Sequence, residues 1–79
     1  MLVIDFFIDD ESVSIDIATT VIDYSGKNIN KIKILTLNQA LKTPKCLGGL
    51  VSFGGSKQQM IFSIGKEVLW SEPYTRLDI

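Results

Sequence analysis

The glycine-rich segment CLGGLVSFGGSK, residues 46–57, is the first place in this chain to look for chemistry, because glycines, a serine and a lysine together can bind phosphate. In a phosphate-binding loop the lysine directly follows the last glycine, and a helix begins there. Here two residues separate Gly54 from Lys57, and a strand-like apolar run follows. We therefore expect Gly54–Gly55 to form a hairpin turn, and Gly48–Gly49 either to start a strand or to let another backbone approach closely.

Other groups that could support catalysis or metal binding are few. The chain contains no histidine, which is the commonest general base and metal ligand in proteins. Cys46 stands among apolar residues, a setting in which cysteine usually packs rather than reacts. Asp5, Asp16 and Asp23 lack the close spacing of a calcium-binding loop. We therefore expect a protein that is not an enzyme, with no catalytic residue, no metal site and no cofactor.

Charge is strongly segregated along the chain, although the formal net charge is only −1. Residues 1–23 contain six acidic residues and no basic one, whereas residues 24–66 contain seven lysines and no acidic residue. Two interpretations stay open. The two regions could lie side by side and pair through exposed ion pairs, or they could form a dipolar surface that attracts a charged partner.

Length and composition predict one small folded domain. The chain has 79 residues, of which 46% are hydrophobic and 22% charged, as is typical of globular proteins. A single cysteine excludes a disulfide within the chain, which is usual for cytoplasmic proteins. Apolar runs are shorter than the roughly 18 residues of a membrane span. We expect a single β-rich domain over residues 1–79, located in the cytoplasm and without a membrane partner.

The elements that must position any functional group are mostly strands. Alternating apolar residues and turn-forming clusters predict a mostly β fold of two antiparallel three-stranded meanders, packed as a small six-stranded sandwich or partly open barrel. The predicted meanders cover residues 2–36 and 47–72. A connector over residues 37–46, with one short helical turn near 37–43, joins them, and a tail follows over residues 73–79.

Residue pairing within the predicted meanders follows from keeping one face apolar. In the first meander, a turn centred on residues 10–11 places Ile4 opposite Ile17 and Phe6 opposite Ile15. A third strand over residues 29–36 adds Ile32, opposite Val21, and Ile34 to the same face. In the second meander, turns at residues 55–56 and 65–66 give two further pairings. They place Leu50 opposite Ile61 and Phe62 opposite Leu69.

The function that this pattern favours is binding to another protein, as a small inhibitor, adaptor or subunit that could also associate with itself as a homodimer. The second predicted meander is apolar on both faces, and aromatic residues near its end are typical anchors of protein interfaces. The candidate interaction residues are Leu50, Phe53, Trp70 and Tyr74.

Binding of single-stranded nucleic acid is the alternative. A small β-barrel with basic side chains and aromatic platforms is a common way to hold single strands. The candidate residues lie in the lysine-rich middle of the chain and are Lys27, Lys31, Lys33 and Lys57. Against this alternative stand the acidic first strands and a sequence pI near 5.1.

Overall fold

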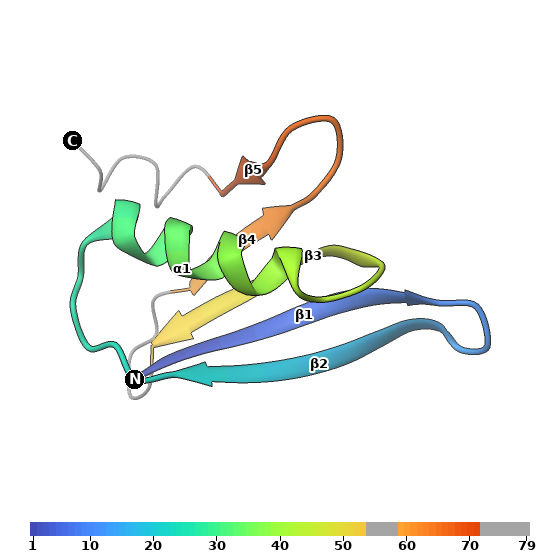
Figure 1. Ribbon diagram of the computed structural model, residues 1–79, viewed down its shortest axis with the longest axis horizontal. Coiled ribbons are helices and arrows are strands. Elements are labelled where there is room, and N and C mark those ends of the chain that lie inside the picture. The colour runs from blue at the N-terminus through green and yellow to red at the C-terminus, as the bar shows by residue number, and fades with distance from the viewer. Residues whose placement is uncertain (54–58, 72–79) are drawn as a thin grey trace.

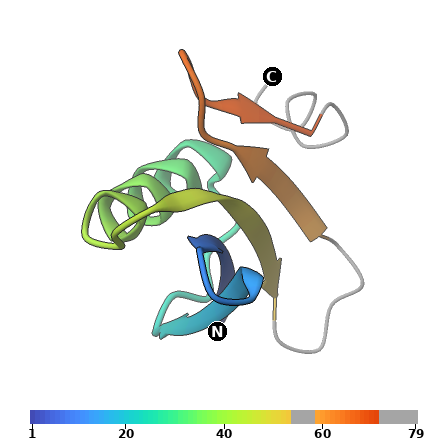
Figure 2. The same cartoon turned by 90° about the vertical axis from the view of Figure 1, so that its right-hand side faces the viewer.

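The computed structural model describes residues 1–53 and 59–71, which form one antiparallel sheet of five strands and one helix (Figure 1). The elements are, in chain order, β1 (Leu2–Asp10), β2 (Ser14–Ile22), α1 (Ile29–Leu41), β3 (Cys46–Phe53), β4 (Gln59–Ser63) and β5 (Leu69–Trp70). The strand order in the sheet is β2-β1-β3-β4-β5, and α1 lies on one side of it (Figure 2). The mostly β fold class is confirmed. The predicted turn at Gly54–Gly55 and the predicted tail over residues 73–79 lie outside the described residues.

The third predicted strand, residues 29–36, is wrong, because these residues belong to α1. Asn28 caps the helix, since its side-chain oxygen accepts a hydrogen bond from the Lys31 backbone N–H at 3.1 Å. The buried side chains of α1 recur every three or four residues and are Ile29, Ile32, Thr36 and Ala40. The strand prediction relied on alternate residues and placed Ile34 in the core, where the structure leaves it 55% exposed. The helical turn predicted near 37–43 is the end of this longer helix.

The hairpin of β1 and β2 differs from the predicted register by three residues, since Ile17 lies opposite Phe7 rather than Ile4. The reason is a longer turn organised by Asp10. Its carboxylate accepts hydrogen bonds from the Ser12 N–H at 2.8 Å and from the Ser12 hydroxyl at 2.7 Å. Successive side chains of a strand point to opposite faces, so a shift by an odd number of residues moves the predicted inward side chains of β2 to the other face.

The connection between β2 and β3 passes over β1. The chain leaves the sheet at β2, forms α1 and returns as β3 on the other side of β1, which makes a split β-α-β unit (Figure 1). β1 therefore pairs with a strand on each side. Its inward side chains, Leu2, Ile4 and Phe6, are at most 1% exposed.

The second half of the chain is closer to its prediction. β3, β4 and β5 are consecutive antiparallel neighbours, and Leu50 lies opposite Ile61 as predicted. The last pairing differs by one residue, because Phe62 lies opposite Trp70 and not Leu69. This shift brings Trp70 to the same side of the sheet as Phe62.

The core lies between α1 and one face of the sheet, and this helix-on-sheet arrangement replaces the predicted six-stranded sandwich or barrel. The buried hydrophobic residues are Leu2, Ile4, Phe6, Ile29, Ile32, Ala40, Val51, Met60 and Phe62. Thr36 is also fully buried, and its hydroxyl donates to the Ile32 carbonyl one helical turn earlier at 2.7 Å. The core is therefore one-sided, and the opposite face of the sheet is left without a covering layer among the described elements.

Gly48 and Gly49 admit neighbouring groups, as predicted. A Cβ at Gly48, where φ is +146°, would meet the Ser63 Cα at 2.8 Å, and one at Gly49 would meet the ring of Phe62 at 3.0 Å. Gly49 lies opposite Phe6 on one side and Phe62 on the other. The two rings close over the glycine in an edge-to-face contact, with centroids 6.1 Å apart and planes at 82°.

Candidate functional site

The face of the sheet opposite α1, called the far face below, is the most distinctive surface of the described structure. Residues opposite each other on paired strands share a face, so the register defines its members. The apolar members are Val3, Phe7, Ile15, Ile17, Val21, Leu50, Ile61 and Leu69, and the polar members are Asp5, Asp9, Thr19, Ser52, Gln59 and Ser63.

Five aliphatic side chains of the far face are more than half exposed. The exposed fractions are 59% for Ile15, 59% for Ile17, 56% for Val21, 55% for Ile61 and 60% for Leu69. An antiparallel sheet can leave one face in water, but that face then usually carries polar residues. A broad apolar face without a covering layer is instead typical of a surface that another molecule covers.

Asp5 lies within the far face rather than at its rim. Val3 and Phe7, two residues away on β1, share its face, and its neighbours across the strands are Thr19 and Leu50. The Asp5 carboxylate accepts a hydrogen bond from the Thr19 hydroxyl at 2.7 Å. A ligand that covers the surrounding apolar side chains therefore also covers this carboxylate.

No strand of the described sheet contains a lysine or arginine, although the strands contain four aspartates. The described lysines lie on α1, in the connecting segments and in the β4–β5 turn. The acidic and basic regions of the sequence meet at an ion pair between Lys45 and Glu11, whose side chains lie 3.5 Å apart and are 58% and 88% exposed. An ion pair this exposed contributes little stability, so the far face keeps a local excess of negative charge.

Of the predicted interaction residues, Leu50 belongs to the far face, where it is half-buried. Trp70 lies on the opposite side and packs against the core: its ring is 5.0 Å from that of Phe62, and the Lys33 ammonium lies 5.8 Å from its centroid. The Phe53 side chain and Tyr74 lie outside the described residues. The structure therefore does not bring Leu50 and Trp70 onto one surface.

The predicted nucleic-acid residues are also spread apart. Lys27 precedes α1, whereas Lys31 and Lys33 lie two residues apart on the helix, a spacing that directs side chains to different helix faces. Lys33 is half-buried beside Trp70. Lys57 lies outside the described residues.

The exposure of Ile15, Ile17 and Val21 was missed because the predicted register placed them in the core. The signal that could have corrected it is the Asp-Glu-Ser sequence at residues 10–12, since an aspartate often accepts hydrogen bonds from the residue two positions later. Centring the turn on Ser12 reproduces the observed register.

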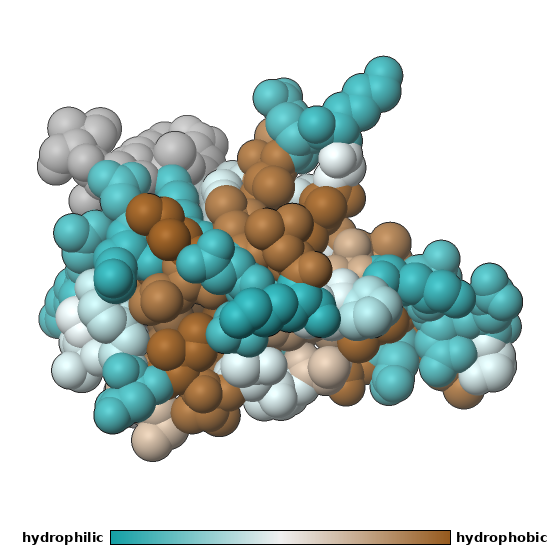
Figure 3. Space-filling view, in the orientation of Figure 1, coloured by the Kyte–Doolittle hydropathy of each residue, from teal (hydrophilic) through white to brown (hydrophobic). Residues whose placement is uncertain are grey.

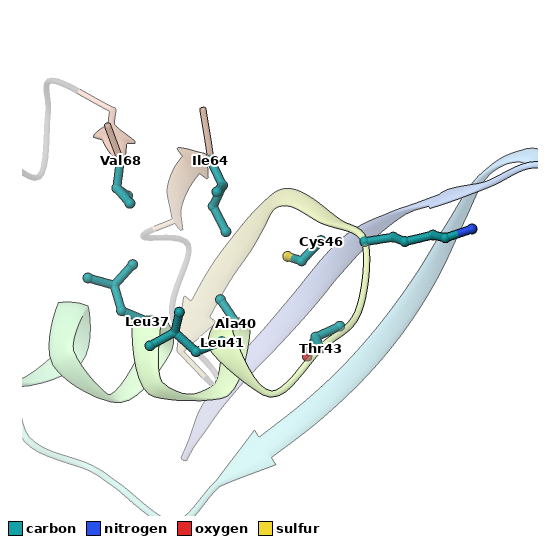
Figure 4. A pocket seen from close by; sticks show the side chains of 8 residues that line it. Leu37, Ala40, Leu41, Thr43, Cys46, Ile64 and Val68 are labelled. Atoms are coloured by element: carbon teal, nitrogen blue, oxygen red, sulfur yellow. The ribbon is translucent and has the colours of Figure 1, made fainter. Parts of the chain in front are cut away.

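A pocket of about 310 Å³ lies on the other side of the molecule, between α1 and the end of the sheet (Figure 4). It is mainly apolar, and the apolar surface next to α1 is visible in Figure 3. The lining residues are Leu37, Ala40, Leu41, Thr43, Lys45, Cys46, Ile64 and Val68. The thiol of Cys46 lies 3.5 Å from the Gly48 carbonyl oxygen, so the cysteine takes part in packing at the start of β3.

The described residues contain no cluster of three or more histidine, cysteine or acidic residues that could hold a metal ion. None of the helical segments in ranges 1–53 and 59–71 is long and apolar enough to cross a membrane. Comparison of the chain with protein-family models, with curated proteins and with solved structures finds no match.

Proposed function

We propose that this protein is a non-enzymatic interaction module that binds another protein through the far face. The observation that carries the proposal is the row of aliphatic side chains, more than half exposed, on the uncovered side of the sheet. An adaptor, an inhibitor or a subunit of an assembly would all use such a surface. The cytoplasm is the compartment that goes with this proposal, because a chain with a single cysteine builds its core without a disulfide.

The energy available from this surface is moderate. Complete burial of a large aliphatic side chain contributes about 1.5–3 kcal/mol, so covering the exposed half of each contributes about 1 kcal/mol. The five most exposed side chains together contribute about 5 kcal/mol, which is similar to the lower end of the cost of association. A specific partner must therefore cover the half-buried members of the far face as well and make favourable polar contacts.

Nucleic-acid binding has less support than protein binding. The broad, open surface of the described sheet is its far face, and the charged side chains there are Asp5 and Asp9. Phosphate groups would be repelled by such a face, because nucleic-acid affinity depends on neutralisation by lysine and arginine. The exposed lysine of α1, Lys31, is not accompanied by a described stacking platform, since Trp70 packs against Phe62 and lies beside the half-buried Lys33.

A pair of matched double variants tests the proposal. Ile17→Gln with Ile61→Gln makes the far face polar, and Ile34→Gln with Leu41→Gln removes as many exposed aliphatic side chains from α1. A photo-crosslinking amino acid at position 15, at the end of the far face, would identify the partner in cells that express the protein. The partner is then purified, and its affinity for each variant is measured by calorimetry.

We expect the far-face variant to bind this partner at least about tenfold more weakly, since it loses two buried apolar contacts. The α1 variant should bind with nearly unchanged affinity. Equal weakening in both variants, or a larger effect of the α1 variant, would show that the partner binds elsewhere. Circular dichroism checks that both variants fold.

A further inference from the structure

We propose that the partner that covers the far face is an amphipathic helix of another protein, which presents a lysine or arginine to Asp5. This inference rests on the function proposed above. Three features of the described structure lead to this partner. They are the position of Asp5, the charge of the strands and the way in which the other side of the sheet is covered.

The Asp5 carboxylate determines which polar group a partner must bring to the far face. Its nearest neighbours on the far face are Val3 and Phe7 along β1 and Thr19 and Leu50 directly across the strands, and of these only Thr19 is polar; it supplies one hydrogen bond at 2.7 Å. A carboxylate can accept several hydrogen bonds, and burying an ionised one with too few partners costs several kcal/mol. A partner that covers Val3 and Phe7 must therefore donate to Asp5. A cationic donor meets this requirement best, because it also neutralises the charge.

A second copy of this chain does not meet the requirement. The strands of the described sheet provide no lysine or arginine, so the charged groups that two packed far faces would bring to the interface are all carboxylates. Asp9 at the hairpin end of the face adds to this repulsion. Like charges placed opposite each other in an interface select against that pairing. The complementary surface is therefore that of a different protein, apolar and basic.

The way in which α1 covers the sheet indicates that the partner's surface is a helix. On the side facing α1, one helix covers the sheet (Figure 2). It buries residues spaced three and four apart, while Asn30 and Lys31 are exposed. A helix on the far face would complete a three-layer arrangement of helix, sheet and helix. Its apolar stripe would cover the exposed aliphatic side chains, and a basic residue within or beside the stripe would reach Asp5.

Three synthetic helical peptides of about 18 residues test this inference, since such a peptide forms an apolar stripe over several turns. They share the same leucine stripe, and their polar positions are all lysine, all glutamine or all glutamate. Binding of each labelled peptide to the intact protein is measured by fluorescence anisotropy. We expect the lysine peptide to bind at least about tenfold more tightly than the glutamine peptide, and the glutamate peptide to bind most weakly.

Two substitutions separate a local contact with Asp5 from attraction by the net charge. Asp5→Asn keeps an oxygen that can accept from Thr19 and removes the charge on the far face. Asp16→Asn removes the same charge from β2, where Asp16 lies on the opposite face of the sheet. We expect Asp5→Asn to weaken binding of the lysine peptide about tenfold and Asp16→Asn to weaken it less than about threefold. Raising the salt concentration tests the charge dependence on the unaltered chain.

The outcomes are distinguishable. Equal affinity for the lysine and glutamine peptides would refute the basic partner but leave apolar docking intact, provided that Ile17→Gln with Ile61→Gln still weakens both. Equal effects of Asp5→Asn and Asp16→Asn would refute the contact with Asp5. A homodimer that dissociates when Ile17 and Ile61 are replaced would also refute the inference, because the occupant would then be a second copy.

Discussion

Replacing Gly49 by alanine should disrupt the sheet at one defined point. The added Cβ would meet the Asp5 carbonyl oxygen of β1 and lie 3.0 Å from the ring of Phe62. The carbonyl is part of the backbone and cannot rotate away, so β1 and β3 must separate locally. The ring of Phe62 must also move from its edge-to-face contact with Phe6. Both adjustments occur in the core, where side chains have little freedom.

Overpacking of this kind costs about 1–3 kcal/mol, and we expect the upper end because backbone must move. A domain of 79 residues has a free energy of unfolding of about 4–12 kcal/mol at about 0.05–0.15 kcal/mol per residue. Gly49→Ala should therefore remove a large fraction of the stability and lower the melting temperature by about 10–20 °C.

Urea denaturation followed by circular dichroism measures this loss, and Gly65→Ala is the matched control. A Cβ at Gly65 would meet no atom within 4 Å, so its free energy of unfolding should change by less than about 0.5 kcal/mol. If Gly49→Ala is as stable as Gly65→Ala, the close approach of β1 to Gly49 does not exist in solution, and the explanation of this glycine is wrong.

Two further predictions concern the hairpin and the last strand. The pKa of Asp10 lies below its ordinary value because the Ser12 hydroxyl and the Ser12 N–H donate to the carboxylate. The resulting stabilisation of the fold is present above the pKa of Asp10 in the unfolded chain and is lost as the pH falls through the lowered pKa of the folded chain. Ser12→Ala should therefore raise the Asp10 pKa in an NMR titration, and an unchanged pKa would contradict the hydroxyl contact. Trp70→Ala should lower the free energy of unfolding by about 2 kcal/mol, because the ring packs on the core. The affinity of the far-face partner should change by less than about threefold. The reverse pattern, stable folding with lost binding, would place the interface at Trp70.

The part of the fold that sequence patterns predict well is the part governed by local alternation. The β3–β4 pairing follows from keeping Val51 and Met60 on one face, and both are fully buried. Because both faces of this hairpin carry apolar side chains, the predicted turn centred on residues 55–56 is what sets the register, and the observed pairing of Leu50 with Ile61 agrees with it. The inward residues of β1, such as Ile4 and Phe6, are predicted by alternation as well.

Residues 29–36 show where alternation is ambiguous. Ile32, Ile34 and Thr36 alternate as in a strand, while Ile29, Ile32 and Thr36 are spaced as in a helix. The cap at Asn28 and the contact of α1 with the core decide in favour of the helix, and tertiary packing of this kind is not visible in a short window of sequence.

The far face was not predicted from the sequence for a related reason. A third strand after β2 would bury Ile17 and Val21 between the two predicted meanders, so the predicted register places both side chains in the core. The observed register leaves them in water because α1 covers the other side of the sheet. Which face of a two-sided sheet is buried depends on where the covering layer lies, and that is a property of the whole fold.

The strand order β2-β1-β3 has a consequence for how the chain is completed during synthesis. β1 is made before β2, but its second neighbour, β3, ends at Phe53, after β2 and α1 have been made. Until then one edge of β1 keeps its backbone groups in water, and the nascent hairpin has no core to cover Leu2 and Ile4. β1 therefore precedes both of its neighbours in the chain but is paired on both edges only after β3 has left the ribosome, so the central part of the sheet cannot form cooperatively before that point.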